Sequence, residues 1–311
     1  MDISNLGYGN DLFILPFDHR SSFEAGLLGI RGREVTPEEL EQLSRYKRVI
    51  YDGFVEALEK GVPAETAAIL VDQKYGADIL ADANKRRITT CTSTEKSGQS
   101  EFDFEYGDGF RDRLEDANPT FAKVLVRYNP DGDAGTNESQ RRRLKLISDY
   151  AHSVGRKFVF ELLVPATDGQ MESVGQDRQA YDLNLRPKLT GRTIAELQQA
   201  AVEPDVWKLE GMDDSTAMQD VVRQAREGGR DKVGIIVLGR GEDEQRVDHW
   251  LTIGAQTEGV IGFAVGRTVF WQPLVDNKEG KISRAAAVSR IAGNYQRIYQ
   301  LFINARSRVA I

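Results

Sequence analysis

Cysteine is almost absent from this sequence of 311 residues, which contains only Cys91. A single cysteine cannot form an intramolecular disulfide, so the cysteine usage gives no indication of an oxidising compartment. The N-terminal segment MDISNLGYGNDLF lacks the basic region and apolar run that mark a signal peptide. No apolar stretch approaches the roughly 20 residues that span a membrane. We therefore expect a cytoplasmic protein without a membrane partner.

Histidine is also scarce, with 3 residues, and the 48 acidic residues outnumber the 41 basic ones, which gives a formal net charge of −7. Transition-metal sites normally draw on several histidines, and only His19 follows a predicted strand, so we expect no such metal and no bound cofactor. The negative charge argues against a nucleic-acid partner, which normally meets a basic face. It does not exclude a phosphorylated ligand, because a local group of arginines and backbone N–H groups binds phosphate whatever the global charge.

Linker-like segments are missing too, and what fills the chain is a repeated alternation of short apolar runs with helical patterns. Most runs are almost continuously apolar, as strands covered on both faces in a parallel sheet are. Eight strands alternating with helices predict a single (β/α)8 TIM barrel domain over residues 1–311. The alternative is an open doubly wound sheet, but the expected G-x-G-x-x-G is absent after the first strand. The predicted strands lie at 12–18, 67–72, 88–92, 121–128, 157–164, 205–210, 232–239 and 259–266.

The helical patterns carry start and stop signals. The first long one begins with Thr36 as a predicted N-cap, has Pro37 in its first turn and ends at Gly61. The last is a long C-terminal helix containing YQRIYQLF, which packs either on its own barrel or on a second subunit, so a homo-oligomer is among the expected assemblies. The predicted helices lie at 36–61, 137–155, 176–202, 213–228, 241–255 and 282–309.

Charged residues interrupt three neighbouring strands of the predicted barrel. Lys123 lies in the fourth strand, Glu161 in the fifth and Lys208 in the sixth. Period-two alternation places each of them on one face with apolar neighbours, but parity does not say which face is inside. Active sites of such barrels lie at the carboxyl ends of the strands, where embedded charges are more tolerable than in the helix layer. We expect these side chains to converge there, beside Asp18 at the end of the first strand.

This combination has a known chemistry. A lysine amine ordinarily has a pKa of about 10.4, which desolvation or a neighbouring cation lowers. The neutral amine of Lys208 would attack a ketone and form a Schiff base, with Lys123 as the second cation. Glu161 would shuttle the proton, and Asp18 would bind or deprotonate a substrate hydroxyl. The alternative for Lys208 is a structural ion pair with Glu210.

Gly-Arg pairs follow the last two predicted strands. Gly239 and Arg240 come after the seventh strand, and Gly266 and Arg267 come after the eighth. Many barrels bind phosphate at this point with backbone N–H groups at a helix N-terminus. Glycine permits close approach of the backbone, and arginine adds a charge-assisted hydrogen bond. We therefore predict a phosphate site at these four residues.

Polar residues at the ends of the first two strands receive further predictions. His19 and Arg20 directly follow Asp18, and both are candidates for substrate binding. Asp72 and Lys74 follow the second strand, and we expect them to form a local ion pair rather than to take part in catalysis.

With these residues in place, the chain resembles the class I aldolases of the tagatose-1,6-bisphosphate aldolase type. It is more similar still to the aldolase-like domain attached to bacterial 5-dehydro-2-deoxygluconokinases of inositol breakdown. The similarity extends over nearly the whole chain, and the order and spacing of its motifs carry it more than any one motif. The motifs are PFDHR, ILVDQKYG, EKSG, AKVLVRYNPD, FELLVP, DVWKLE and GFAVGRTVFW.

The resemblance implies a (β/α)8 fold and metal-independent cleavage of a phosphorylated ketose, or a keto-deoxy-gluconate phosphate, through a lysine imine. The expected products are dihydroxyacetone phosphate and an aldehyde. Carried over by position, the imine lysine is Lys208, the second lysine Lys123 and the acid/base Glu161. Asp18 matches the strand-one aspartate of the family, and Arg267 matches its phosphate-binding arginine.

Departures from the family pattern leave the substrate open. The tagatose enzymes have a different residue at the position of His19, and VLGRGE in the seventh strand replaces their serine-glycine pattern. Two other functions fit the sequence. One is a non-catalytic sugar-phosphate-binding barrel. The other is a Mg2+-dependent barrel lyase or isomerase with oxygen ligands from Asp18, Asp72, Glu161 and Glu210.

Overall fold

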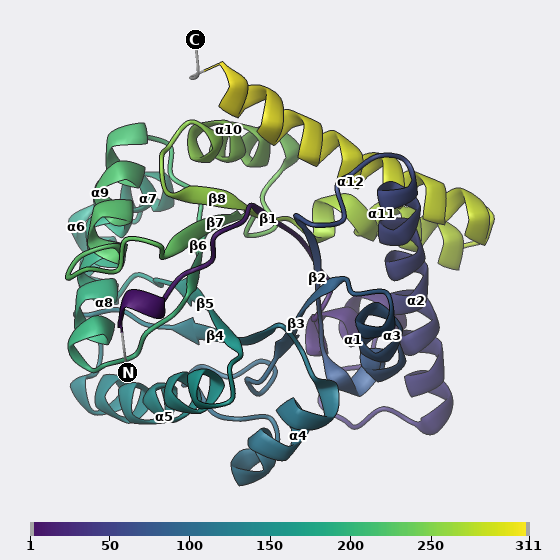
Figure 1. Cartoon of the computed structure of the whole chain (residues 1–311), viewed down its shortest axis with the longest axis horizontal. Helices are drawn as coiled ribbons and strands as arrows, with labels where there is room; N and C mark the ends of the chain where they lie inside the picture. Colours follow the sequence, from purple (N-terminus) through teal and green to yellow (C-terminus); the bar gives the residue numbers. More distant parts are fainter. Residues whose placement is uncertain (1–2, 309–311) are drawn as a thin grey trace.

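The computed structural model describes residues 3–308, in which eight parallel strands close into a barrel. Each strand pairs with the next one in sequence, and β8 pairs with β1 to complete the ring (Figure 1). The predicted (β/α)8 fold is therefore confirmed. The strands are β1 (Leu12–Pro16), β2 (Ala67–Val71), β3 (Thr89–Ser93), β4 (Phe121–Arg127), β5 (Lys157–Leu163), β6 (Val206–Glu210), β7 (Gly234–Leu238) and β8 (Val260–Ala264).

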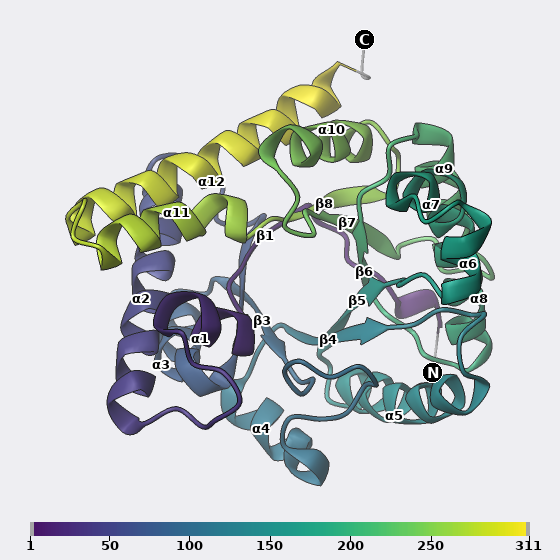
Figure 2. The same ribbon diagram turned by 180° about the vertical axis from the view of Figure 1, so that it is seen from behind.

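Helices form a layer around the outside of the strands (Figure 1, and from behind in Figure 2). None of the helices within residues 3–308 combines the length and the hydropathy that crossing a bilayer requires. The α-helices are α1 (Ser21–Leu28), α2 (Pro37–Glu59), α3 (Gln73–Lys85), α4 (Phe110–Ala117), α5 (Ala134–Ser153), α6 (Asp168–Ser173), α7 (Arg178–Asn184), α8 (Arg186–Gln199), α9 (Ser215–Ala225), α10 (Glu244–Ala255), α11 (Arg267–Lys278) and α12 (Arg284–Ser307), with short 3-10 turns at Ile3–Asn5 and Gly107–Gly109.

The long helix α12 packs on its own barrel, which is one of the two placements that the sequence left open. It lies against α2, α10 and α11 and buries Tyr295 and Phe302. The hydroxyl of Tyr295 donates a hydrogen bond to the backbone oxygen of Phe13 in β1, at 2.6 Å. Figure 2 shows α12 running along one side of the molecule over α11 and α10.

The capping signals in the sequence predicted the start of α2 correctly but placed the start of α5 too late. Thr36 caps α2 in a capping box with Glu39, as the sequence predicts. Helix α5 starts before the predicted Asn137, because the Asp133 side chain accepts a hydrogen bond from the backbone N–H of Thr136. The predicted helix 176–202 is wrong as a single element. It divides into α7 and α8, and Pro187 opens the second of them.

Inside the barrel, three charged residues continue the period-two pattern of the apolar residues that precede them. Phe121, Val159 and Val206 belong to the apolar cluster that fills the barrel interior. Two residues further along the same strands come Lys123, Glu161 and Lys208, which therefore point to the same side. Glu161 and Lys208 pair directly in the register of β5 and β6. The three charged side chains thus form the top of the barrel core, as expected for the mouth.

Candidate active site

A cavity of about 450 Å³ opens at the carboxyl ends of the strands. Its floor includes Lys123, Glu161 and Lys208, and its walls are loops that follow β1, β3, β7 and β8. The predicted site residues all lie on its lining: Asp18, His19, Arg20, Lys123, Glu161, Lys208, Gly239, Arg240, Gly266 and Arg267. The structure therefore brings the whole predicted set into one place, although not all of them are equally free to meet a ligand.

Lys208 is buried in the middle of β6 and forms an ion pair across to β5. Its Nζ atom lies 2.8 Å from Oε2 of Glu161. The alternative pairing of Lys208 with Glu210 does not form, since the Glu210 carboxylate lies 3.0 Å from Nη1 of Arg240. Lys208 is 4% exposed and borders the cavity, so its amine is desolvated but open to a ligand on one side.

Lys123 on β4 is the centre of the charged cluster. Its Nζ donates hydrogen bonds to Oδ2 of Asp18 at 2.8 Å and to Oε1 of Glu95 at 2.7 Å. Oε2 of Glu161 lies 3.0 Å away. The ammonium of Lys123 therefore meets three carboxylates, and through Glu161 it is linked to Lys208.

The buried charges shift one another's protonation. Burial acts to lower the pKa of Lys123, but the carboxylates of Asp18, Glu161 and Glu95 outweigh it and raise the pKa well above the usual value. Burial acts to raise the pKa of Glu161, but the charges of Lys123 and Lys208 lower it overall. The pKa of Asp18 is held far below its usual range, since the same two lysines outweigh the effect of burial. Glu161 and Asp18 are therefore ionised at neutral pH in the resting site.

The phosphate-binding prediction centres on the start of α11. Arg267 is the first residue of this helix, and its Nη2 donates a hydrogen bond to the backbone oxygen of Arg240 at 3.3 Å. Among residues 3–308 no carboxylate lies within ion-pair distance of Arg267, so its charge is available to an anion. A Cβ atom at Gly266 would lie 2.2 Å from the backbone oxygen of Pro16, so only glycine fits there. Gly239 follows the neighbouring strand β7 and is on the same lining.

Arg240 is in a different situation from Arg267. Its guanidinium forms ion pairs with Asp182 at 2.6 Å, Glu242 at 2.9 Å and Glu210 at 3.0 Å. Its role as a phosphate ligand stays a prediction, which these three carboxylates weaken because they neutralise its charge. Two of these carboxylates lie outside the Gly-Arg motif, because Asp182 comes from α7 and Glu210 from β6. The motif alone therefore could not predict that Arg240 is neutralised.

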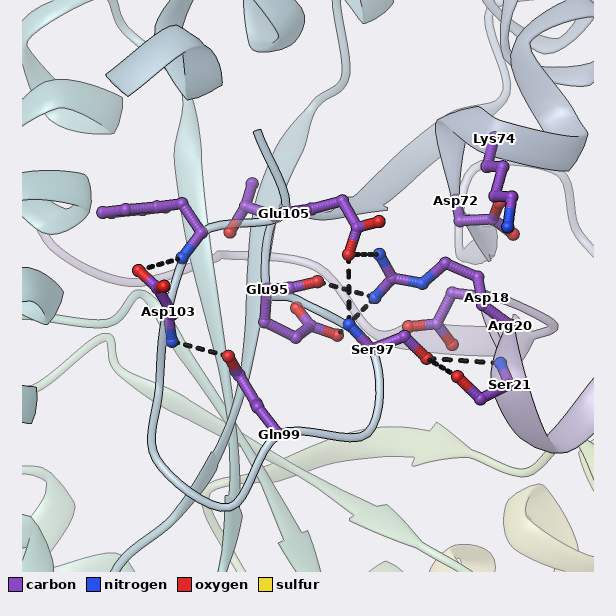
Figure 3. Close-up of polar contacts among 12 residues, drawn as sticks. Asp18, Arg20, Ser21, Asp72, Lys74, Glu95, Ser97, Gln99, Asp103 and Glu105 are labelled. Carbon is purple, nitrogen blue, oxygen red and sulfur yellow. Dashed lines mark hydrogen bonds and ion pairs between the residues drawn. The ribbon is translucent and has the colours of Figure 1, made fainter. Parts of the chain in front are cut away.

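The guanidinium of Arg20 likewise binds other groups of the protein. It donates from Nη2 to the backbone oxygen of Glu95 at 2.7 Å, and its Nη1 lies 3.1 Å from Oε2 of Glu105. The loop after β3 is also tied to the start of α1 by a 2.8 Å hydrogen bond between the Ser97 and Ser21 hydroxyls (Figure 3). Arg20 thus holds that loop at the edge of the cavity, and its substrate contact stays a prediction.

His19 faces the cavity with an uncharged ring. Burial, opposed by the negative charge of Asp18, lowers the pKa of His19 to about 4. Its ring packs edge-on against Phe270 of α11, and its Nδ1 atom has no hydrogen-bond partner. Its backbone oxygen accepts a hydrogen bond from Nζ of Lys47 at 3.0 Å. His19 can therefore offer a neutral donor or acceptor to a ligand.

The predicted pair between Asp72 and Lys74 is wrong. Asp72 pairs with the fully buried Lys47 of α2, and Lys74 lies 3.1 Å from Oε1 of Glu24 in α1. Lys47 carried no signal in the sequence, because a lysine inside an amphipathic helix usually lies at the surface. Glu95 was also not among the predicted site residues. Its only signal is that it directly follows the third strand in TSTEKSG.

Comparison with known proteins gives one family and a set of solved structures. The family model described as "Uncharacterized protein conserved in bacteria (DUF2090)" matches residues 7–306. No curated protein matches the chain. Fructose-bisphosphate aldolase from Plasmodium falciparum has a TM-score of 0.60 at 13% identity, over 96% of this chain and 92% of that one.

Two further solved structures are similar in the same way. Fructose-bisphosphate aldolase from Slackia heliotrinireducens has a TM-score of 0.54 at 13% identity, covering 91% of this chain and 86% of that one. Cgl0159 from Corynebacterium glutamicum has a TM-score of 0.54 at 18% identity, covering 94% of this chain and 88% of that one. At these identities the similarity establishes the shared barrel fold, and the chemistry has to be argued from the site.

Proposed function

We propose that this chain, which belongs to the DUF2090 family, is a metal-independent class I aldolase. It would cleave a phosphorylated ketose, or a keto-deoxy-gluconate phosphate, through an imine on Lys208 to give dihydroxyacetone phosphate and an aldehyde. One observation carries this proposal: the amine of Lys208 lies 2.8 Å from the Glu161 carboxylate and borders a cavity open to a small molecule. The aldolases among the solved structures of this fold support the same class.

The first half of the reaction forms the imine. Glu161 takes a proton from Lys208, and the neutral amine attacks the ketone carbon of the substrate. The protonated Glu161 then gives its proton to the departing hydroxyl, so water leaves and a protonated imine remains. Lys123 stays charged beside Glu161, which favours the ionised carboxylate at the start of each cycle.

The second half breaks the carbon–carbon bond. The electron pair of that bond moves into the protonated imine, which becomes an enamine, while the hydroxyl on the leaving carbon becomes the carbonyl of the aldehyde. A base must take the hydroxyl proton, and Asp18 lies at the cavity to bind that hydroxyl. The enamine carbon is then protonated, and water releases the ketone phosphate from Lys208. A phosphate bound at Arg267 and the N-terminus of α11 would fix the substrate during these steps.

The carboxylates proposed for a magnesium site are already paired with cations. Asp18 and Glu161 contact Lys123, Asp72 contacts Lys47, and Glu210 contacts Arg240. A carboxylate paired in this way has to exchange its lysine or arginine partner before it can bind a divalent cation. This arrangement favours the lysine mechanism over the Mg2+-dependent lyase.

The experiment is a retro-aldol assay over a panel of phosphorylated ketoses, with dihydroxyacetone phosphate as the measured product. The proposal predicts release that is unchanged by EDTA and abolished in Lys208→Met. The matched control is Lys96→Met, because Lys96 is an exposed lysine on the same cavity. Activity lost on EDTA treatment would indicate the metal enzyme. Ligand-dependent thermal stabilisation without any product would indicate the non-catalytic sugar-phosphate-binding barrel.

A further inference from the structure

Three carboxylates share one buried ammonium, and they come from three different parts of the barrel. Asp18 follows β1, Glu95 follows β3 and Glu161 lies on β5, while the shared Lys123 lies on β4. An ammonium has three N–H groups and no lone pair to spare. The distances from Nζ are 2.8 Å, 2.7 Å and 3.0 Å in that order. Each carboxylate can therefore exchange a proton with each of the others through Lys123, which gives up one proton as it accepts another.

Glu95 is the member of this set that the proposed reaction leaves without a task. It is 5% exposed and borders the cavity, and its Oε2 atom is buried without a hydrogen-bond partner. Arg20 fixes it in place, donating to its backbone oxygen at 2.7 Å and lying 3.6 Å from its Oε1 atom. Figure 3 shows the guanidinium of Arg20 directed toward Glu95, beside the chain at Ser97. A buried carboxylate oxygen without a partner is costly, which calls for an explanation.

The surroundings of Glu95 raise the pKa of its carboxyl group, whereas those of Asp18 lower it. Burial raises the pKa of Glu95, partly offset by the positive charges of Lys123 and Arg20. The pKa of Asp18 lies far below its usual range, because Lys123 and Lys208 outweigh the effect of burial. A proton that reaches Asp18 therefore moves on to Glu95 with a gain in free energy. Two acids whose environments separate their pKa values in this way suit different steps of one reaction.

We propose that Glu95 is the proton store of this site, and that it receives through Lys123 the proton that a substrate hydroxyl gives up when the carbon–carbon bond breaks. This inference rests on the proposed aldolase function. Because Glu95 acts through Lys123, it is a positioning and relay residue rather than a group that touches the substrate.

The transfer balances as follows. When the bond breaks, the hydroxyl proton of the leaving carbon passes to Asp18 and the aldehyde carbonyl forms. Asp18 passes a proton to Lys123 as Lys123 passes one to Glu95, so the ammonium stays charged and Glu95 becomes neutral. Glu95 then returns its proton through Lys123 to Glu161, and Glu161 gives that proton to the enamine carbon. No proton, oxidant or metal is needed from outside.

The variant Glu95→Gln tests whether Glu95 stores the proton. The amide keeps an acceptor oxygen facing Lys123 but cannot take up the proton. The proposal predicts that this variant still forms the borohydride-trapped adduct with dihydroxyacetone phosphate and still exchanges the α-hydrogen of that ketone with deuterated water. Neither partial reaction needs the hydroxyl proton. Cleavage of the full substrate should fall by about 100-fold or more in kcat, with KM changed by less than about threefold. A purely structural role for Glu95 would change all three readouts together.

The outcomes separate this inference from the proposed function. Cleavage within about threefold of wild type overturns the role of Glu95, and so does the loss of adduct and exchange together with cleavage. Absence of any adduct in the wild-type protein overturns the aldolase proposal itself. Glu105→Gln is the matched control, because Glu105 also pairs with Arg20 at 3.1 Å but is not among the carboxylates around Lys123. It should cleave at nearly the wild-type rate.

A second variant keeps the test open if Glu95→Gln does not fold. Glu95→Ala leaves a small space beside Lys123 that a formate ion can fill. Added formate should then restore cleavage at least about tenfold, since it supplies the missing proton acceptor. Failure of formate to restore cleavage in a Glu95→Ala protein that still forms the adduct overturns the proposal.

Discussion

Glu161 and Lys208 lie directly opposite each other in the register of β5 and β6, and their charged atoms are 2.8 Å apart. The pairing is a property of the strands themselves, so it does not depend on a loop conformation. It places a carboxylate and an amine in contact at the carboxyl end of the barrel, where the cavity opens. This fixed contact is the basis of the lysine mechanism that we propose.

Glu161→Gln should lower kcat strongly and leave the fold intact. The amide cannot take the proton from Lys208, so both formation of the imine and its hydrolysis slow down. We expect a fall of about 100-fold to 10,000-fold in kcat. Steady-state kinetics on the best substrate of the panel measures it, with circular dichroism as the check on folding. A variant that retains most of its activity would show that another group handles this proton.

Lys123→Met should remove activity and also destabilise the protein. The change leaves Asp18, Glu95 and Glu161 buried near one another without their common cation. Breaking a buried charge network in this way costs about 3–5 kcal/mol in the free energy of unfolding. Urea unfolding measures the loss.

The control for that loss is Lys74→Met, because Lys74 pairs with Glu24 near the surface and its side chain is 35% exposed. A surface pair of this kind contributes less than about 1 kcal/mol. Equal effects of the two substitutions would contradict the central position that we assign to Lys123.

Arg267→Gln should weaken substrate binding without much change in stability. Arg267 is exposed and makes a single 3.3 Å hydrogen bond within the protein, so its charge is free for a phosphate. Loss of a charged hydrogen bond of about 1.5–3 kcal/mol corresponds to a rise of about 10-fold to 100-fold in KM. Arg240→Gln should show the opposite pattern, with lower stability from the loss of its ion pairs to Asp182 and Glu210. Similar KM changes for both would restore Arg240 as a phosphate ligand.

Stability should fall with acidification before the carboxylates begin to titrate. The pKa of His19 is lowered to about 4 in the folded protein, against about 6.5 in the unfolded chain. Between these values the unfolded state binds more protons, so the free energy of unfolding decreases as the pH drops through that window. Below it, the lowered pKa values of Asp18 and Glu161 give a further loss.

His19→Gln isolates the histidine contribution to this pH dependence. The variant should lose less stability than wild type between about pH 6.5 and pH 4 and match its slope above that range. Urea unfolding at a series of pH values gives both slopes. Identical slopes in the two proteins would show that His19 is freely protonated in the folded state.

Sequence patterns predicted three residues that line the cavity, because strand periodicity continues to the barrel mouth. Lys123, Glu161 and Lys208 each follow an interior apolar residue by two positions, so period-two alternation already placed each with its apolar neighbours. The alternation could not say which face is inside, and only closure of the barrel resolves that. The phosphate site, inferred from two Gly-Arg pairs at equivalent strand ends, stays a prediction.

What the sequence could not give is the pairing between distant elements. Asp182, which lies 58 positions earlier in the chain, neutralises Arg240, and no local sequence pattern predicts that contact. Glu95 lies in an irregular loop where no periodicity applies, and it meets Lys123 because β3 pairs with β4 and brings Ser93 beside Lys123. The sequence placed the Gly-Arg pair after the eighth strand before a helix but gave no bounds for that helix, which is α11 with Pro273 in its interior.

The most direct test of the whole account is the mass of the protein after borohydride reduction in the presence of dihydroxyacetone phosphate. The account predicts a covalent adduct of one ligand per chain, located by peptide mapping on Lys208. Lys208→Met should form no adduct, while Lys96→Met should form it normally. An adduct on a different lysine, or none on a folded and ligand-saturated protein, would contradict the claim that Lys208 is the reacting amine.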